Sequence, residues 1–569
     1  MAFQVSPGVQ VKEIDATSVV PAVSTSIGGF AGSFNWGPVD QVITVGSEKS
    51  LAGIFGTPDD NTFSYFLTAA SFLKYGNALK VVRVASGHKN ATSDGAGQLI
   101  KNDDDYINNN YATSDADNKG QWAAKFPGIL GNSLKVETVT ADISTSNFNA
   151  WASQGQFDSK PGTSDYATNL GKSASFNDEV HVIVIDQDGL FTGTANTVLE
   201  TFAFMSIGSD AKANDGTSNY YVDVINQRSN YIRFMDHISS LSSAGSALSG
   251  LSSLSGTLTS VDSDSLGGGL DDNVPTTGEI ALGYDLLEDG ETVDVNLLFA
   301  TPDANGSNVI ANDLISIAAA RKDCMAFVSP PIADTQGSST PAADVKVFAD
   351  TLTSSSYASC DSTALYVYDK YNDKYRWIGA AGHVAGLCAN TDTVADSWFS
   401  PAGVNRGQLL GVVKLAHNPK QADRDTLYKA RVNPIVSLSG QGTILFGDKT
   451  LLSKPSAFDR INVRRLFNTL EKAISTAAKA QLFEFNDEFT QAQFKNLIEP
   501  FLRDVKGRRG LTDFLVVCDS TNNTSQVVDG NQFVADIFIK PSRSINFITL
   551  NFVATRSGVE FTEIAGTSA

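Results

Sequence analysis

Two short amphipathic segments, one near each end of the chain, constrain its fold more than any other feature. Near the start, Val9–Ile14 alternates apolar and polar residues after a Ser-Pro-Gly turn, which predicts a strand. Near the end, Val559–Ile564 has the same alternation. Neither segment has a neighbouring run that could form a hairpin with it. Each strand must therefore pair with a distant part of its own chain or with another chain.

The chain has 569 residues, which is too many for one hydrophobic core and predicts three or four domains. Hydrophobic residues make up 42% and charged residues 18%, as in ordinary globular proteins, which disfavours disordered and fibrous classes. The start of the chain lacks the features of a secretory signal, and no apolar run approaches the roughly 18 residues of a membrane span. The four cysteines lie far apart without CxxC spacing, which predicts reduced, mostly buried thiols.

The formal charge of −20 disfavours wrapping of nucleic acid, because that binding needs Lys and Arg to neutralise phosphates. The charge is unevenly distributed. Residues 421–569 carry 18 Lys and Arg against 16 Asp and Glu, a net of +2, which leaves 24 against 46, a net of −22, in residues 1–420. We interpret the acidic part as facing solvent and the near-neutral part as packed among other chains.

The first part of the chain predicts a compact unit over residues 24–87. A helix is expected from Thr62 to Tyr75, with Thr62 as its cap, followed by a buried strand over Leu79–Val84. Beyond His88 the composition becomes rich in Asn, Asp and Ser, which is typical of surface loops and insertions. We infer an inserted, outward-facing domain over residues 88–260 that contains strands and ends in a Ser/Gly/Leu tract.

A strand, helix and strand over residues 293–328 indicate that an α/β layer resumes after the insertion. The clearest helical pattern begins at Phe458: apolar residues from Ile461 to Ala477 fall on one face, which leaves Arg464, Arg465 and Lys472 to the rest of the helix surface. A second helix is expected after a capping box at Thr490 and Gln493, with a kink or restart at Pro500. Strands are then expected at residues 514–518, 533–539 and 545–553.

The nearest approach to a phosphate-binding loop is Gly442–Thr450. Such a loop needs Lys directly after its second Gly and small residues between the glycines, so that backbone N–H groups can surround a phosphate. Here Asp448 stands in the Lys position and the intervening residues are bulky, so we expect a strand that ends in a turn.

Other patterns of catalysis or metal binding are weak. Asp115–Gly120 begins like a calcium loop, but Lys119 replaces an oxygen ligand and no Glu closes the loop. The five histidines show no HxxxH or HxH spacing, and there is no Gly-x-Ser-x-Gly elbow. We therefore predict no catalytic residue, no metal site and no cofactor.

Arg503, Lys506, Arg508 and Arg509 form a basic cluster near the expected end of the second helix. Cations at a helix C-terminus interact favourably with the helix dipole, which is sufficient to explain them. Alternatively, the cluster docks onto an acidic partner. The sequence leaves both interpretations open.

Several segments resemble the tail-sheath family of contractile phages, in particular the T-even-type sheaths. The resemblance begins at Ser6-Pro7-Gly8-Val9 and includes the Trp36-Gly37-Pro38 turn. It is strongest in the C-terminal half and weakest over residues 88–265. Further matching segments are Phe72–Asn77, Pro127–Asn132, Tyr368–Asp373, Ser400–Gly407, Phe458–Phe467 and Asn546–Arg556.

The resemblance implies an α+β multidomain fold. An inner α/β sheath core domain would be completed by strands exchanged with neighbouring subunits, beside a middle α/β domain and an inserted β-rich outer domain. The implied ranges are 1–22 for the N-terminal arm, 23–87 and 261–420 for the middle domain, 88–260 for the outer domain, 421–554 for the inner domain and 555–569 for the C-terminal arm. The exchanged side chains would be Val9, Val11, Ile14, Val559, Phe561 and Ile564.

The same resemblance implies a non-enzymatic virion protein that is made in the host cytoplasm. Its copies would form stacked hexameric rings around a tail tube protein and contract by domain rearrangement, driving the tube through the host envelope for genome ejection. Baseplate and tail terminator proteins would be further partners, without direct contact to nucleic acid or insertion into membrane. Arg503, Lys506, Arg508 and Arg509 are candidates to face the tube.

Two other functions remain open from the sequence. The chain could be a different virion structural protein of a baseplate or capsid. It could also be a nucleotide-dependent enzyme that uses the Gly442–Thr450 loop.

Overall fold

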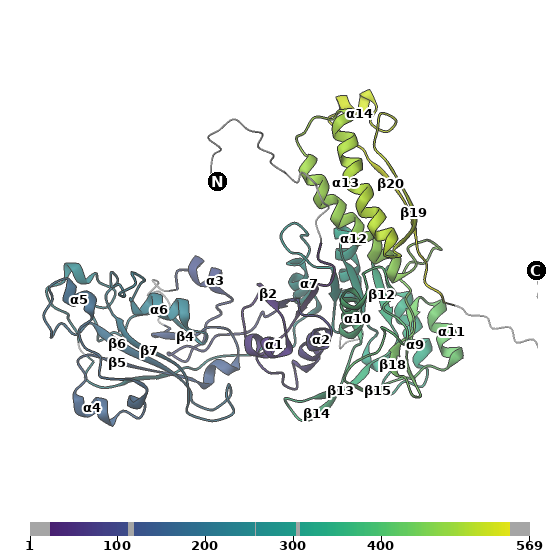
Figure 1. The fold of residues 1–569 in the computed structure, drawn as a ribbon. Coiled ribbons are helices and arrows are strands. Elements are labelled where there is room, and N and C mark those ends of the chain that lie inside the picture. Colours follow the sequence, from purple (N-terminus) through teal and green to yellow (C-terminus); the bar gives the residue numbers. More distant parts are fainter. Residues whose placement is uncertain (1–22, 112–118, 257, 303–307, 547–569) are drawn as a thin grey trace, which may run out of the picture. The chain divides into compact units, whose positions relative to one another are not determined.

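The fold is that of a computed structural model, which describes residues 23–111, 119–256, 258–302 and 308–546 (Figure 1). It contains two compact units, the first ending at Leu482 and the second beginning at Phe483. The arm residues Val9, Val11, Ile14, Val559, Phe561 and Ile564 lie outside the described residues.

A seven-stranded sheet forms the centre of the first unit, in the order β16-β12-β11-β10-β1-β3-β2. All neighbouring strands are parallel except β2, which runs antiparallel to β3. The strands are short and apolar, and most are buried on both faces, as central strands of a covered parallel sheet must be. Their bounds are β1 Gly28–Gly32, β2 Val42–Val45, β3 Leu79–Arg83, β10 Leu297–Phe299, β11 Met325–Val328, β12 Ala358–Asp361 and β16 Val432–Asn433.

Successive residues of a strand point to opposite faces of a sheet, so these apolar strands place apolar side chains on both faces. Helices cover each face. Phe30 and Phe299 belong to one core with α1 Glu48–Phe55, α2 Phe63–Leu73 and α10 Ala381–Val394. Ala31 and Leu298 belong to the other core. The helices of that second core are α7 Thr277–Asp285, α8 Val309–Arg321, α9 Pro341–Asp350 and α11 Gln421–Lys429.

Smaller elements surround the sheet. β13 Leu365–Asp369, β14 Lys374–Ile378 and β15 Val412–Leu415 form an antiparallel sheet in the order β14-β13-β15. β17 Ile435–Leu438 and β18 Gly442–Leu445 form a hairpin. The 18-residue helix α12 Ile461–Ala478 completes the unit, and its apolar face is buried as predicted.

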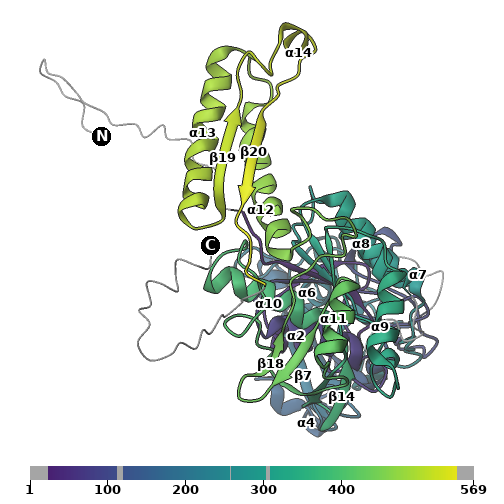
Figure 2. The same cartoon turned by 90° about the vertical axis from the view of Figure 1, so that its right-hand side faces the viewer.

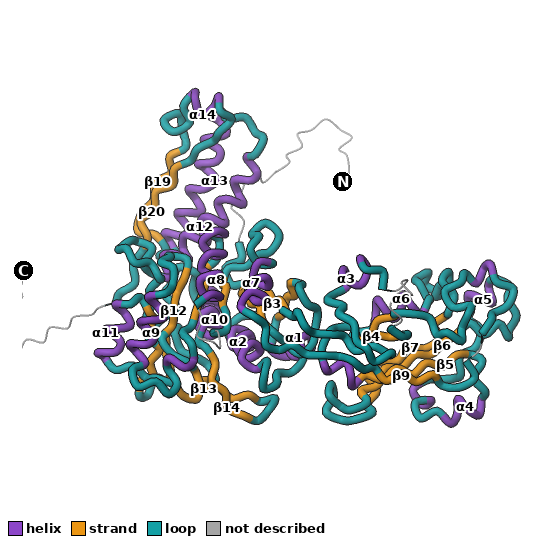
Figure 3. Tube along the Cα trace, turned by 180° about the vertical axis from the view of Figure 1, so that it is seen from behind, coloured by secondary structure: helices purple, strands orange, loops and turns teal. Residues whose placement is uncertain are grey.

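The segment between β3 and α7 is an insertion with cores of its own. A four-stranded antiparallel sheet has the order β7-β6-β5-β9 (Figure 3). β4 pairs with β8. The strands are β4 Trp122–Ala124, β5 Leu134–Thr140, β6 Glu179–Asp186, β7 Thr197–Ser206, β8 Ile232–Phe234 and β9 Asp262–Ser265. The helices are α3 Asp103–Asn108, α4 Thr145–Ala150, α5 Asp165–Asn169 and α6 Tyr221–Arg228.

Arg83, the last residue of β3, joins the insertion to the sheet. Its fully buried guanidinium donates to the carbonyl oxygens of Phe34 at 2.8 Å, Gly37 at 2.7 Å and Pro127 at 2.8 Å. These carbonyls come from the Trp-Gly-Pro turn and from the Pro-Gly element of the insertion. One cation therefore holds together two motifs that lie far apart in the sequence.

His88 lies in the same joint, with its Nε2 3.2 Å from Asn273 Oδ1. Burial and then the charge of Arg83 lower the pKa of His88 to about 4. The His88 imidazole takes up a proton near pH 6.5 in the unfolded chain, but only near pH 4 in the folded chain. The stability that the neutral, buried imidazole allows is therefore fully present above pH 6.5 and is lost as the pH falls toward 4. The loss amounts to up to about 3 kcal/mol.

We therefore expect His88→Gln, which keeps a donor for Asn273 but cannot titrate, to flatten the fall in thermal stability between pH 6.5 and 4. Melting temperatures of both proteins across this pH range test the prediction. Parallel curves for the two proteins would contradict it.

The second unit consists of α13 Glu488–Gly507, the strands β19 Leu511–Val517 and β20 Asp536–Pro541, and the short helix α14 Ser525–Asp529. The two strands pair antiparallel beside α13 (Figure 2). Phe494 and Ile498 are buried on the helix, while Leu515 and Phe538 lie opposite each other on the outer face of the strands. Among the described residues neither strand has a second partner.

Two local predictions differ from the structure, and a third, a kink or restart at Pro500, differs in one of its alternatives. The side chain of Thr62 does not cap α2 but donates to Asp59 Oδ1 at 2.9 Å. Asp487, not Thr490, caps α13, because its carboxylate accepts from the Thr490 N–H at 2.8 Å. The helix does not restart at Pro500, which lies inside it.

Candidate interaction sites

The start of the described chain is attached to α12 by two cations. Arg465 donates to the carbonyl oxygen of Thr25 at 3.2 Å and to Asp392 Oδ2 at 2.7 Å. The hydroxyl of Thr25 donates to the same Asp392 oxygen at 2.6 Å. Since Arg465 is only 4% exposed, this is a buried ion pair that also satisfies backbone.

Lys472 makes a parallel attachment two turns further along α12. Its ammonium donates to the carbonyl oxygen of Ser24 at 3.2 Å and forms an ion pair with Asp294. Asn296 accepts from the Ile27 N–H at 3.3 Å, and the Leu297 N–H donates to the Ile27 carbonyl at 3.0 Å. Residues 24–27 are thereby fixed to the body, and the predicted N-terminal strand ends ten residues before them, at Ile14.

The sequence interpretation missed this anchor, which we define as Arg465 and Lys472 with Asp392 and Asp294. Periodicity assigned Arg464 and Arg465 to the open surface of the helix, but both side chains are buried. The available signal was the spacing of Arg465, Asn468 and Lys472, which places polar side chains on one face at i, i+3 and i+7.

The β19–β20 hairpin leaves apolar surface uncovered. Leu515 and Phe538 are 57% and 59% exposed, while Val516 on the opposite face is buried. Phe483, Phe485 and Phe489, at and before the start of α13, are also exposed. A two-stranded hairpin is marginal on its own, and an open edge can accept a further strand.

The basic cluster lies at the end of α13 and in the turn that follows it. Lys506 is 3.0 Å from Asp513, Arg508 is 3.5 Å from Asp504, and Arg503 is 4.0 Å from Glu499. All these partners are on the surface, where ion pairs are weak and exchange readily. The cations are therefore accessible, although their field is partly offset by local carboxylates.

The segment that resembled a phosphate loop has another structure. β18 spans Gly442–Leu445, as expected for a strand ending in a turn, and no helix N-terminus follows Gly447 directly. Asp448 is buried, and the Lys449 ammonium donates to the Tyr428 carbonyl oxygen at 2.7 Å. This lysine is therefore engaged with its own chain.

We also located the other residues that could act in catalysis or bind a metal, namely the cysteines, the histidines and the segment that begins like a calcium loop. All four cysteines are free and buried, and burial raises the pKa of Cys324 and of Cys388 to about 12. His383 is buried with its Nδ1 2.9 Å from the Tyr75 hydroxyl. Most of Asp115–Gly120 lies outside the described residues. Within the described ranges, no group of three His, Cys, Asp or Glu side chains could hold a metal ion, and no helix is long and apolar enough to cross a membrane.

Three family profiles match the chain in sequence. The phage tail sheath protein central domain matches residues 276–451, and the phage tail sheath C-terminal domain matches residues 453–555. The N-terminal region of domain III of the tail sheath protein Gp18 matches residues 25–84. Together they include the central sheet, α12 and the β19–β20 hairpin.

Whole proteins and solved structures agree with these matches. The tail sheath proteins of Vibrio phage KVP40 and Enterobacteria phage T4 are 34% and 33% identical to the chain, and each alignment covers 99% of both sequences. A cryo-EM structure of a contracted sheath complex, from the PVC extracellular contractile injection system, has a TM-score of 0.51 at 14% identity. That match covers 98% of this chain and 99% of the other, and it shows a shared mixed α+β, multidomain fold.

Proposed function

Because the chain belongs to the phage tail sheath family and is a non-enzymatic structural subunit of a contractile tail sheath, we propose that it assembles into stacked hexameric rings around a tail tube. The alignment to two tail sheath proteins over 99% of each chain carries this proposal. It favours the sheath over the alternatives of a nucleotide-dependent enzyme and of a baseplate or capsid protein. In the virion the sheath would also contact baseplate and tail terminator proteins.

Electron microscopy of the purified full-length chain tests this assembly. Hollow tubes of stacked six-membered rings are expected at high protein concentration, with no added nucleotide. Only monomers, or closed shells, at all concentrations would contradict the proposal.

The two terminal arms would link neighbouring subunits by adding strands to the second unit of the next copy. β19 and β20 each have an edge that no described strand pairs with, which supports this proposal, and so do the exposed side chains of Leu515 and Phe538. The anchor on α12 supports it as well, since it fixes the point from which the N-terminal arm departs. A donated strand would use main-chain hydrogen bonds for affinity and alternate side chains for specificity.

The four-stranded sheet of the insertion is a poor acceptor by comparison. Its edge strand β7 has two register shifts and a left-handed residue at Phe204, φ 54°, which interrupt a regular edge. Its other edge, β9, carries Asp262 and Asp264. Charges and bulges of this kind discourage strand addition, so the second unit is favoured as the place of exchange.

Contraction would then be a rearrangement of domains that stay connected through the arms. Energy would be stored in the extended lattice of sheath subunits. Release of this energy would drive the tube through the host envelope for genome ejection. The buried joint at Arg83 supports domains that move as bodies, because its three hydrogen bonds tie the insertion to the sheet.

We propose that Arg503, Lys506, Arg508 and Arg509 face the tube. Reversing all four to Glu is expected to weaken assembly on purified tubes strongly, because four attractive charges become repulsive. Cosedimentation of the chain with tubes at low and moderate salt measures this effect. A matched variant reverses four exposed lysines of the first unit, Lys49, Lys346, Lys420 and Lys429. Unchanged cosedimentation of the variant with the reversed cluster would show that the cluster does not dock.

A further inference from the structure

The outward face of the β14-β13-β15 sheet carries four aromatic rings. Tyr366 lies opposite Trp377 and Tyr368 opposite Tyr375. Ring centroids are 4.6 Å apart in the first pair and 5.2 Å apart in the second. Tyr368 and Tyr375 are 46% and 53% exposed. We call these four residues the aromatic face; the alternate residues on the other side of the sheet, Leu365, Val367 and Ile378, are buried in the core.

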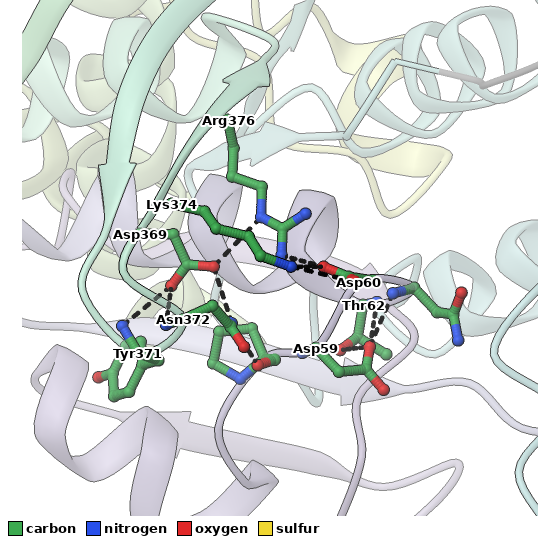
Figure 4. A network of polar contacts seen from close by, with 10 residues as sticks. Asp59, Asp60, Thr62, Asp369, Tyr371, Asn372, Lys374 and Arg376 are labelled. Atoms are coloured by element: carbon green, nitrogen blue, oxygen red, sulfur yellow. Dashed lines mark hydrogen bonds and ion pairs between the residues drawn. The ribbon is translucent and has the colours of Figure 1, made fainter.

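A polar network holds this face in place (Figure 4). Arg376 of β14 pairs with Asp60, which lies just before α2, and donates to Asp369 Oδ2 at 3.3 Å. The Asn372 side chain donates to the Pro58 carbonyl oxygen at 2.9 Å, and Lys374 is 3.2 Å from Asp60. A surface that is already ordered loses little conformational entropy on binding.

Lys414 of β15 lies beside the aromatic face. Its ammonium is 4.6 Å from the centroid of the Tyr366 ring and 5.5 Å from that of Trp377. In the part of the chain that the structure describes, no carboxylate lies within ion-pair distance of Lys414. Tyr and Trp are enriched at the centres of protein interfaces, and a carboxylate from another molecule would pair with the Lys414 ammonium.

A complementary surface lies at the end of α7. Leu282 and Leu286 are 66% and 39% exposed there, next to Asp285, Glu288 and Asp289. We call these five residues the acidic surface. α7 has no basic residue of its own in its last turn, and the cation at its C-terminus is Arg321 of α8, which donates to the Leu287 carbonyl oxygen at 2.5 Å. The exposed carboxylates at this end oppose the helix dipole and do not stabilise the helix.

The acidic surface concentrates negative charge. Burial raises the pKa of the neighbouring Asp313, and the carboxylates of Asp285 and Glu288 raise it further. This charge density complements Lys414, and the two exposed leucines complement the aromatic rings. The two surfaces therefore match in polarity, and in charge at Lys414, whereas Asp373, which accepts from the Tyr368 hydroxyl at 2.7 Å, adds a negative charge at the other end of the aromatic face.

We propose that the aromatic face and Lys414 of one copy dock onto the acidic surface of a second copy of this chain. The aromatic face covers the core on one side of the central sheet, whereas α7 packs in the core on the other side. Such a contact is head-to-tail. In a docked pair, one aromatic face and one acidic surface therefore stay unoccupied, so further copies can add at both ends. The inference rests on the proposed sheath assembly and adds a side-chain contact to the strand exchange.

Charge exchange between the two surfaces tests the contact. Lys414→Glu is expected to raise the critical concentration for tube formation about tenfold, and Lys414→Glu combined with Glu288→Lys is expected to restore it. Tyr368→Ser with Tyr375→Ser should also raise it by about tenfold or more. Sedimentation measures the critical concentration, and melting temperature shows that each variant is folded.

Lys346→Glu on α9 is the matched control, because this lysine is exposed and lies outside both surfaces. Wild-type critical concentrations for the Lys414 and tyrosine variants would overturn the proposal. A loss that Glu288→Lys does not restore would overturn α7 as the docking partner. If the wild-type chain forms no tubes, the sheath assembly itself fails. Disulfide formation between Lys414→Cys and Glu288→Cys chains, mixed at high concentration, then still tests the contact, and its absence would overturn it.

Discussion

Deletion of residues 1–18 is expected to abolish tube formation while leaving a folded, soluble chain. The deletion removes Val9, Val11 and Ile14, which we propose add a strand to the next subunit. It leaves residues 24–27, which Arg465, Lys472 and Asn296 hold to the body. Folding should persist because β1, the first strand of the central sheet, begins at Gly28. Electron microscopy reports assembly, and circular dichroism with a melting curve reports folding.

A matched pair of full-length variants separates strand exchange from a simple effect of length. Val9→Ser, Val11→Ser and Ile14→Ser together remove the apolar side of the predicted strand. Gln10→Ser with Lys12→Ser changes its polar side and should assemble normally. Truncation from Ser557 onward should reproduce the deletion phenotype from the other end of the chain. Tubes formed by both truncated chains would contradict the arm mechanism.

Substitution of Arg83 by Met is expected to destabilise the first unit more than any surface change. Methionine fills much of the same volume but leaves the carbonyl oxygens of Phe34, Gly37 and Pro127 without their buried donor. Each buried unsatisfied group costs about 1–3 kcal/mol, so a loss of about 3 kcal/mol or more in the free energy of unfolding is expected. The shift of the urea midpoint measures this loss.

Arg228→Met provides the comparison, since Arg228 is exposed at the end of α6. Its midpoint should remain within the small range typical of surface substitutions. A loss below about 1 kcal/mol for Arg83→Met would show that the joint relaxes or admits water. In that case the insertion is held less firmly than the three hydrogen bonds indicate.

The sequence predicted elements whose patterns are local. β3 and β11 are short apolar runs, and α12 has one continuous apolar face, so their own residues specify them. The strand order of the central sheet could not be predicted from local patterns, because β10 pairs with β1, which precedes it by the whole insertion. Nothing in the residues near Leu297 identifies Gly28 as the neighbour.

Side-chain roles were harder to predict than elements for the same reason. Arg465 has the polarity of a surface residue, and only Thr25 and Asp392, both distant in sequence, make it a buried anchor. Asp487 replaced Thr490 as the cap of α13 because the helix begins one turn earlier than its apolar pattern. The resemblance supplied the family, whereas strand exchange and the tube-facing cluster remain proposals.

The position of β1 gives the chain a mechanical direction. β1 pairs parallel with β3 on one side and β10 on the other, and its N-terminal end continues into residues 24–27. Tension that arrives from the N-terminus therefore pulls along the axis of a central strand, where the hydrogen bonds of both ladders and of the anchor resist together in shear. In an isolated chain, a force applied to the second unit would instead meet one ladder among the described strands, β19–β20. Strands donated by neighbouring copies would reinforce this ladder, so an isolated chain under tension should yield first in the second unit, while the central sheet stays intact.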